Sequence, residues 1–418
     1  MQDVIKAVRN LGFRYLWIDV LCIIQDSEDD WLAESAKMDD VFRSAVVTLA
    51  VAASGDHSEG MFRPRIAHCV RPIRFEGFNL TQDTKERFEK QGSLYLFPAT
   101  KVVAKGVRPK GVLDTRGWVL QEQLLSPRIL YYGSGELYWD CISMSGSESS
   151  PSFASLLDDD KSSETWALKY IRRAITGSQN TQVSQKYMGE AWMELIMNYT
   201  SRYLTMPLDK LIAIRGIIMA VERRFGRDAI LAGLWRSNLW RQLSWWCKHP
   251  VVTSQLETRL QAPSWSWLNQ DGPVYYQNSL WSKSEFKELI SVVDVEHAEA
   301  STDLQKSIIS GTLTLLGYTF PYTLAADDFK PEAWKRFRRQ TRNAGMWWLD
   351  EPAALPLKVE CVVIGEDNFA KLLICLCITP VARSNKYKRI GLCHWEGMLD
   401  DVSRFIGEHP AKKRIILV

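Results

Sequence analysis

An ordered set of polar and aromatic side chains lies near the start of the sequence, in the stretch RYLWIDVLCIIQD. Asp19 stands in the middle of an apolar run, and Gln25 and Asp26 follow at its end. Core packing does not require a carboxylate inside such a run, so the pattern predicts a polar site where Asp19 orients a ligand hydroxyl or a catalytic group. Trp17, Gln25 and Asp26 would bind the ligand. Purely structural roles stay open: Asp19 as the cap of a turn, and Gln25 and Asp26 as supports of a helix start.

A second group of candidates lies further along the chain, in the segment TRGWVLQEQ. Glu122 follows Trp118 by four residues, so both side chains share one face of the predicted helix. A carboxylate against an indole is partly removed from water, which suits it to acid or base chemistry. Arg116 and Gln121, with Trp139 in the strand that follows, would complete the binding surface. An ion pair between Glu122 and a neighbouring arginine, with no chemical role, is the equally open alternative.

The segments around these candidates predict the elements that position them. Residues 15–24 are rich in aromatic and β-branched side chains, which predicts a strand buried on both faces. Ser27, with Asp30 three residues later, is typical of a helix start, and residues 45–53 predict a second buried strand. A strand, a helix and a strand over so short a span favour a right-handed crossover and a parallel sheet. The site would then lie at the carboxyl edge of that sheet.

Two long blocks resemble the fungal heterokaryon incompatibility (HET) domain. The stretch of residues 14–53, with LWID, LCI, Q, DW, E and M in that order, is similar to the second block of the family. Residues 115–141, TRGWVLQEQLLSPRILYYGSGELYWDC, are similar to its third block. Segments that resemble those found after the domain are YTSRYLTMPLDKLIAIRGI, GLWRSNLWRQLSWW, APSWSWLNQDGPVYY and RIGLCHWE. The family's first block, a strand resembling YVALSYCWG, is not in the sequence, so the resemblance implies an N-terminally truncated HET domain.

The resemblance also implies a function. HET domains are similar to TIR domains, which cleave NAD through a glutamate in a W…E arrangement, so Glu122 is the implied catalytic residue. Asp19 and Arg116 would position the nicotinamide ribose. NAD is then a substrate, and no cofactor is expected. The implied role is a cytosolic effector of fungal self/non-self recognition and cell death.

The tryptophan content favours a second class of function. The sequence has 17 tryptophans, and a subset of them around a cleft would form an apolar, aromatic pocket. A HET scaffold with such a pocket would suit a cofactor-free cyclase of secondary metabolism acting on a terpenoid or polyketide, including a Diels–Alder enzyme. Holding two reacting ends together lowers a barrier by ~7–11 kcal/mol at best. The missing first block and the absence of nucleotide-binding and metal-binding motifs favour this alternative.

Composition limits the cellular compartment and the classes of binding partner that we expect. The net charge is +3 with dispersed basic residues, which does not favour nucleic acid, and no apolar run is long enough to span a bilayer. The eight cysteines include no Cys-x-x-Cys pair, which favours a reduced, cytoplasmic chain without a zinc site. We therefore expect a small-molecule ligand, no nucleic acid, no membrane and no bound metal. The sequence leaves open whether the chain forms a homo-oligomer.

The predicted fold class is α/β in the first part and α+β overall. A parallel-sheet HET/TIR-like core with inserted loops is expected in residues 1–145, and a mobile linker in residues 146–165. A helical segment in residues 166–250 and a β-rich region in residues 251–418, packed on the former, would follow. Periodicity and turn residues predict a hairpin of residues 129–132 and 137–141, helices over 168–175, 189–202, 208–225 and 235–246, and strands over 308–318, 358–364, 372–378, 389–393 and 414–418.

Overall fold

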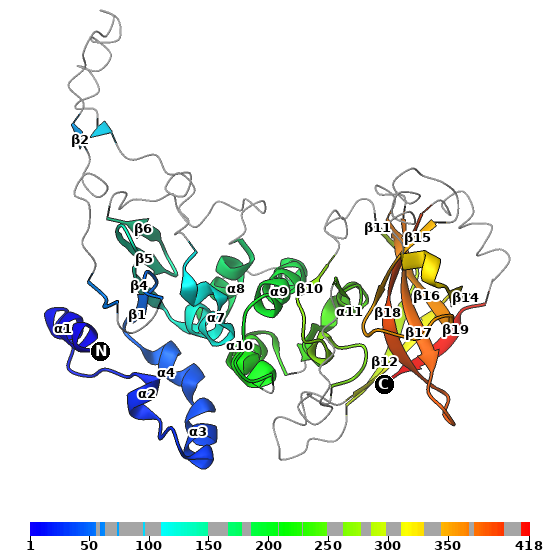
Figure 1. Cartoon of the computed structure of the whole chain (residues 1–418), viewed down its shortest axis with the longest axis horizontal. Helices are drawn as coiled ribbons and strands as arrows, with labels where there is room; N and C mark the ends of the chain where they lie inside the picture. Colours follow the sequence, from blue (N-terminus) through cyan, green and yellow to red (C-terminus); the bar gives the residue numbers. More distant parts are fainter. Residues whose placement is uncertain are drawn as a thin grey trace, which may run out of the picture. The chain divides into compact units, whose positions relative to one another are not determined.

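The structure, a computed structural model, describes residues 1–55, 59–62, 73–74, 95–96, 110–148, 166–177, 185–207, 209–227, 229–248, 262–276, 286–297, 311–329, 344–367, 372–396 and 411–418. The chain divides into two compact units, Met1–Asn180 and Thr181–Val418. Both contain helices and strands (Figure 1), as an α+β fold requires. Among the described helices, none has the length and apolar character needed to cross a bilayer. Most of the predicted linker, from residue 149 to 165, lies outside the described residues.

The first unit begins with four helices. They are α1 (Gln2–Asn10), α2 (Asp19–Cys22), α3 (Glu28–Ser35) and α4 (Met38–Ser44). The predicted cap of α3 is confirmed, because Ser27 Oγ accepts a hydrogen bond from the backbone N–H of Asp30 at 3.2 Å. Three acidic residues in the first turn of α3 add favourable charge at the positive end of the helix dipole.

The predicted strand over residues 15–24 is wrong. These residues are irregular and then form the single turn α2, with Tyr15 87% exposed. The backbone finds local partners instead of a sheet: Val20 N–H donates to Asp19 Oδ1 and Ile24 N–H donates to Asp30 Oδ2, both at 2.8 Å. Short carboxylate side chains that capture nearby N–H groups compete with strand pairing in this way.

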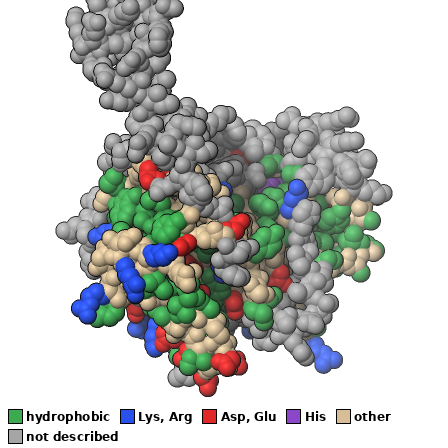
Figure 2. Space-filling model, turned by 60° about the vertical axis from the view of Figure 1, so that its left-hand side comes forward, with side chains coloured by type: hydrophobic (Ala, Val, Ile, Leu, Met, Phe, Trp, Pro, Cys, Tyr) green, Lys and Arg blue, Asp and Glu red, His purple; other side chains and the backbone are tan. Residues whose placement is uncertain are grey.

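Apolar side chains of this segment therefore remain on the surface. Val20, Leu21 and Ile24 are each more than half exposed. Figure 2, with the left-hand side of Figure 1 turned forward, shows hydrophobic side chains interspersed with charged ones over the visible surface.

A four-stranded sheet completes the first unit. Its order is β1 (Thr48–Val51), β4 (Arg128–Tyr132), β5 (Leu137–Cys141) and β6 (Ser145–Ser147). The predicted hairpin is present as β4 and β5. β1 pairs with β4 in parallel, whereas the other pairs are antiparallel, so a wider TIR-like parallel core is not confirmed. The remaining described elements of this unit are β2 (Ile73–Arg74), β3 (Tyr95–Leu96), the 3₁₀ turn η2 (Val112–Thr115), α7 (Gly117–Leu125) and α8 (Trp166–Thr176).

The second unit starts with helical and irregular segments rich in buried indoles. Its two long helices, α9 (Gln185–Thr200) and α10 (Asp209–Phe225), match the predicted ones. The predicted helix over residues 235–246 forms only as η3 (Arg236–Asn238) and the single turn α11 (Leu239–Gln242). Short elements complete the region: β7 (Ile230–Leu231), β8 (Leu234–Trp235), β9 (Trp246–Cys247), η5 (Trp267–Asn269) and β10 (Val274–Tyr275).

A glycine sits at the centre of these indoles. The carbonyl oxygen of Gly233 accepts hydrogen bonds from Nε1 of Trp192 and of Trp267, both at 2.8 Å. Gly233 has φ +82°, in the left-handed region that glycine adopts without strain. Both tryptophans are fully buried, so this one carbonyl anchors two large core side chains.

Replacing Gly233 with alanine is expected to lower the free energy of unfolding by about 2–3 kcal/mol. The new Cβ would lie only 2.8 Å from Trp267 Nε1, in addition to the cost of the positive φ. Gly226→Ala is the matched control, because Gly226 has φ +102° but no atom within 4 Å of an added Cβ. Urea unfolding of both variants should show the larger loss for Gly233→Ala. Equal losses would contradict the importance of the close Trp267 contact.

A nine-stranded sheet fills the rest of the second unit. Seven of its strands follow the order β11 (Phe286–Glu288), β16 (Leu357–Asp367), β17 (Leu372–Pro380), β18 (Lys386–Glu396), β19 (Lys413–Leu417), β13 (Gly311–Gly317) and β12 (Ser291–His297). The other two strands pair outside this order. β14 (Thr319–Leu324) pairs with β16, and β15 (Ala344–Leu349) pairs with β18. The five predicted strands correspond to β13, β16, β17, β18 and β19. A 3₁₀ turn, η7 (Ala326–Phe329), follows β14.

Four cysteines lie together in the core on one side of this sheet. Cys361 of β16 is opposite Cys377 of β17, and Cys375 of β17 is opposite Cys393 of β18. All four are fully buried. Burial raises the pKa of Cys375, Cys377 and Cys393 well above its ordinary value, so these thiols behave as small apolar side chains.

Candidate functional site

The predicted catalytic helix is α7 of the first unit. Glu122 and Trp118 lie on it one turn apart, and both are half-buried. The indole of Trp118 makes an edge-to-face contact with Trp31 of α3, with ring centroids 6.2 Å apart and planes at 85°. Arg116 is the exposed residue that precedes α7, whereas Gln121 is only 2% exposed and is part of the core. The structure thus places Glu122 on the same short helix as Trp118, whose contact with Trp31 joins α7 to α3.

The earlier group of predicted residues lies in and beside the exposed turn α2. The Asp19 carboxylate accepts a hydrogen bond from Val20 N–H, and within the described residues no hydrogen bond links it to Glu122. Gln25 Nε2 donates to the carbonyl oxygen of Ile23 at 2.9 Å, and Asp26 is exposed. The contacts of Asp19 and Gln25 support the local turn.

The predicted aromatic residues Trp17 and Trp139 are half-buried and lie on different elements. Trp17 makes an edge-to-face contact with Phe42 of α4 at 5.8 Å between ring centroids. Trp139 lies on β5, opposite Leu130 of β4 and Gly146 of β6. No ring contact between Trp139 and Trp118 is found among the described residues.

A buried arginine that sequence reasoning missed holds the end of α7. Arg172 of α8 is 6% exposed. Its Nη1 pairs with Asp140 Oδ2 at 2.5 Å, and its Nη2 donates to the carbonyl oxygen of Ser126, just after α7, at 2.7 Å. The signal in the sequence is an arginine on the otherwise apolar face of an amphipathic helix. Arg172 is a positioning residue for α7 through Ser126.

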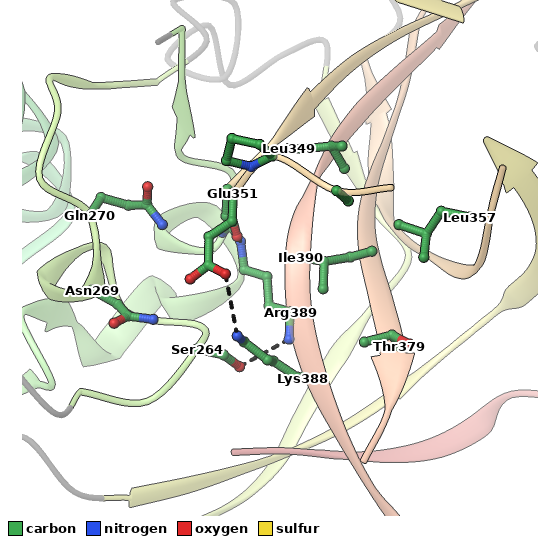
Figure 3. Close-up of a pocket in the computed structure, with 13 residues that line it drawn as sticks. Ser264, Asn269, Gln270, Leu349, Glu351, Leu357, Thr379, Lys388, Arg389 and Ile390 are labelled. Atoms are coloured by element: carbon green, nitrogen blue, oxygen red, sulfur yellow. Dashed lines mark hydrogen bonds and ion pairs between the residues drawn. The ribbon is translucent and has the colours of Figure 1, made fainter. Parts of the chain in front are cut away.

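The second unit contains a pocket of about 160 Å³ between residues 264–270, the end of β15 and the strand β18 (Figure 3). Leu349, Leu357 and Ile390 form its apolar wall, and Asn269 and Gln270 contribute amide groups. The other lining residues are Ser264, Asp350, Glu351, Pro352, Ala353, Thr379, Lys388 and Arg389.

A buried ion pair forms the floor of this pocket. Arg389 Nε donates to Asp350 Oδ2 at 2.9 Å, and Nη2 lies 3.3 Å from Asp350 Oδ1. The guanidinium also donates to the carbonyl oxygens of Leu243 and Trp245 at 2.8 and 2.6 Å and lies 3.3 Å from the ring centroid of Trp245. Burial raises the pKa of Asp350, and Arg389 opposes that rise. The pair therefore serves structure, since every guanidinium nitrogen is already engaged.

A second ion pair lies at the edge of the pocket and is open to solvent. Lys388 Nζ is 3.8 Å from Glu351 Oε2, and the two side chains are 45% and 40% exposed. Figure 3 shows the two side chains directed toward each other. Such an exposed pair contributes about 0–1 kcal/mol to stability.

The comparison with known families concerns the first unit. Residues 1–122 match the family model described as heterokaryon incompatibility protein (HET). The chain carries a HET domain. The matched residues include α1 to α4, β1 and the part of α7 that ends at Glu122, so the resemblance seen in the sequence is confirmed there. No match was found among curated proteins or among solved structures.

The described residues include no group of three or more His, Cys, Asp and Glu that could hold a metal ion. In the residues matched to HET, the predicted catalytic carboxylate of Glu122 is half-buried and one turn after Trp118 on α7. The pocket of the second unit, which lies outside the residues matched to HET, offers neutral amides above an apolar wall.

Proposed function

We propose that this protein is an effector of heterokaryon incompatibility whose HET domain cleaves NAD with Glu122 as the catalytic carboxylate. The observation that carries the proposal is the position of Glu122 on α7. It is half-buried and one turn after Trp118, whose indole packs against Trp31. The family match of residues 1–122 supports the effector role.

The reaction breaks the bond between the nicotinamide nitrogen and C1′ of the ribose. The electron pair of that bond leaves with nicotinamide, and C1′ develops the positive charge of an oxocarbenium ion, as in glycoside hydrolysis. Water then adds to C1′ and releases one proton, which gives nicotinamide and ADP-ribose. A carboxylate beside C1′ stabilises the developing charge, more strongly where aromatic rings exclude water.

The neighbouring residues have distinct roles in this proposal. Trp118 and Trp31 present aromatic surface on which a planar base can stack. Arg116, exposed at the start of α7, attracts the pyrophosphate. Asp19 binds a ribose hydroxyl from the exposed turn α2. Arg172 holds α7 in place through the Ser126 carbonyl.

The test is release of nicotinamide from NAD by the purified full chain. The Glu122→Gln variant keeps the size of the side chain and removes its charge, so we expect the rate to fall at least ~100-fold. Glu28→Gln is the matched control, because Glu28 is exposed in the first turn of α3, and it should retain the wild-type rate. Circular dichroism would show that both variants fold.

Two results would contradict the proposal. One is a wild-type protein that leaves NAD intact, and the other is a Glu122→Gln variant as active as wild type. The cyclase alternative has no supporting observation in the described part of the chain. The pocket found there has no tryptophan in its wall, and its volume of about 160 Å³ is below the ~300–1,000 Å³ typical of small-molecule sites.

A further inference from the structure

We propose that the pocket of the second unit is a binding site for a small neutral molecule that carries a carboxamide group on a compact apolar body. The site is separate from α7, and the proposal does not depend on NAD cleavage. It rests on Gln270, on the balance of charges in the pocket and on the size and character of the wall.

Gln270 is a buried polar residue whose side chain points toward the pocket (Figure 3). The residue is 2% exposed, and its backbone carbonyl oxygen accepts a hydrogen bond from Lys210 Nζ, which fixes its position. Within the described residues, its side-chain amide has no hydrogen-bond partner. A ligand that supplies a hydrogen-bond partner to this amide would therefore bind there favourably.

A second amide lies next to Gln270. Asn269 also lines the pocket, and its side chain makes no hydrogen bond to any described residue. An amide presents one acceptor and two donor hydrogens. A ligand carboxamide matches this arrangement, because it can donate to the glutamine oxygen while accepting from the glutamine nitrogen.

The charges around the pocket favour a neutral ligand. Asp350 is paired with Arg389, and Glu351 with Lys388. The four lining charges therefore sum to zero, and neither sign is left uncompensated. An anion would have to compete with Glu351 for Lys388, and a cation would have to compete with Lys388 for Glu351.

The volume and the wall limit the size of the ligand. A cavity of about 160 Å³ is similar to an apolar cavity that holds one benzene molecule, ~150 Å³. The aliphatic side chains of Leu349, Leu357 and Ile390 line it. The ligand is therefore of the size of one substituted ring or a short branched chain, with its carboxamide directed at Gln270.

Benzamide is the probe, and saturation-transfer NMR and calorimetry on the full chain are the measurements. We expect benzamide to bind with a Kd of about 1 mM or lower. Benzoate, which has the same shape but carries a charge, and toluene, which lacks the amide, should each bind at least ~10-fold more weakly.

Two variants assign the binding to this pocket. Gln270→Met keeps the length of the side chain and removes its hydrogen bonds, so it should weaken benzamide at least ~10-fold and leave toluene unchanged. Ala353→Leu, at an exposed position of the lining, should reduce binding of both probes by filling space. Gln25→Met, at an exposed site in the first unit, is the matched control and should bind like wild type.

The proposal is overturned if benzamide binds no better than toluene or benzoate. It is also overturned if benzamide binding survives Ala353→Leu, or if a folded Gln270→Met binds it like wild type. If Gln270→Met does not fold, the Ala353→Leu comparison and the ranking of the three probes still decide it. Loss of benzamide binding together with intact NAD cleavage would separate this site from α7.

Discussion

Replacing Arg389 with methionine is expected to lower the free energy of unfolding of the second unit by about 3–5 kcal/mol. The change leaves the Asp350 carboxylate, which is 5% exposed, without its cation. It also removes the donors that satisfy the carbonyl oxygens of Leu243 and Trp245. Urea unfolding, with hydrogen exchange of the β18 amides to identify the unit affected, measures the loss.

The neighbouring residue on the same strand provides the control for this prediction. Lys388→Met also removes one cation from an ion pair, but that pair is nearly half exposed, so a loss of about 0–1 kcal/mol is expected. If both variants lost the same free energy of unfolding, the buried pair would contribute no more to stability than the exposed pair, and the prediction would be wrong.

The Arg389→Met deficit should also depend on pH. Burial raises the pKa of Asp350, and removal of the arginine takes away the group that opposes this rise. A carboxyl whose folded-state pKa lies above its unfolded value favours folding below the unfolded pKa and loses that contribution as the pH rises. The variant should therefore lie closest to wild type in acid and furthest from it at neutral pH.

The second unit is expected to lose about 3 kcal/mol of stability as the pH falls from 6.5 to 4, through His394 alone. His394 of β18 is 1% exposed, and among the described residues neither of its ring nitrogens has a hydrogen-bond partner. Burial lowers its pKa from 6.5 to about 4, against a smaller raising effect of Asp367. The unfolded chain therefore binds a proton in this range that the folded chain does not, and protonation favours unfolding.

The His394→Leu variant isolates this contribution. It removes the titrating ring, whose centroid lies 4.7 Å from that of Trp348, so the stability of the variant should change less between pH 6.5 and 4 than that of wild type. Leu392→Val, on the same strand and equally buried, lowers stability without a titrating group and should keep the wild-type slope. An unchanged slope in His394→Leu would exclude His394 as the cause.

Local signals in the sequence predicted much of the secondary structure. Ser27 caps α3, and the hairpin β4–β5, the helices α9 and α10 and the strands β16 to β18 lie where periodicity and turn residues placed them. In each of these elements, the side chains over a few residues favour the structure that the element adopts. The strands among them still need pairing with one another to form.

Two predicted elements were wrong, and in both segments side chains form hydrogen bonds with backbone groups. Residues 15–24 have the composition of a strand, but Asp19 and Asp30 take up N–H groups that a strand would pair. The helix predicted over residues 235–246 stops after α11. There, Arg389 binds the carbonyl oxygens of Leu243 and Trp245, just beyond the end of α11.

The two candidate sites differ in how far the sequence could reveal them. Trp118 and Glu122 are neighbours through helical spacing alone, so their proximity on α7 follows from the sequence. The pocket joins Gln270, Glu351 and Lys388 from distant parts of the chain. Only the pairing of β15 with β18 and the packing of residues 262–276 bring these side chains together, and no local pattern encodes that.

The cysteines of this protein differ sharply in their access to solvent. Cys22 on α2 is exposed, whereas Cys247, Cys361, Cys375, Cys377 and Cys393 are buried. A maleimide dye would therefore modify Cys22 rapidly and give a fluorescent label beside the predicted residues of the HET domain. The sulfur atoms inside the nine-stranded sheet become reactive only when that sheet opens. The rate of the slow phase of alkylation therefore measures how fast the second unit opens under native conditions.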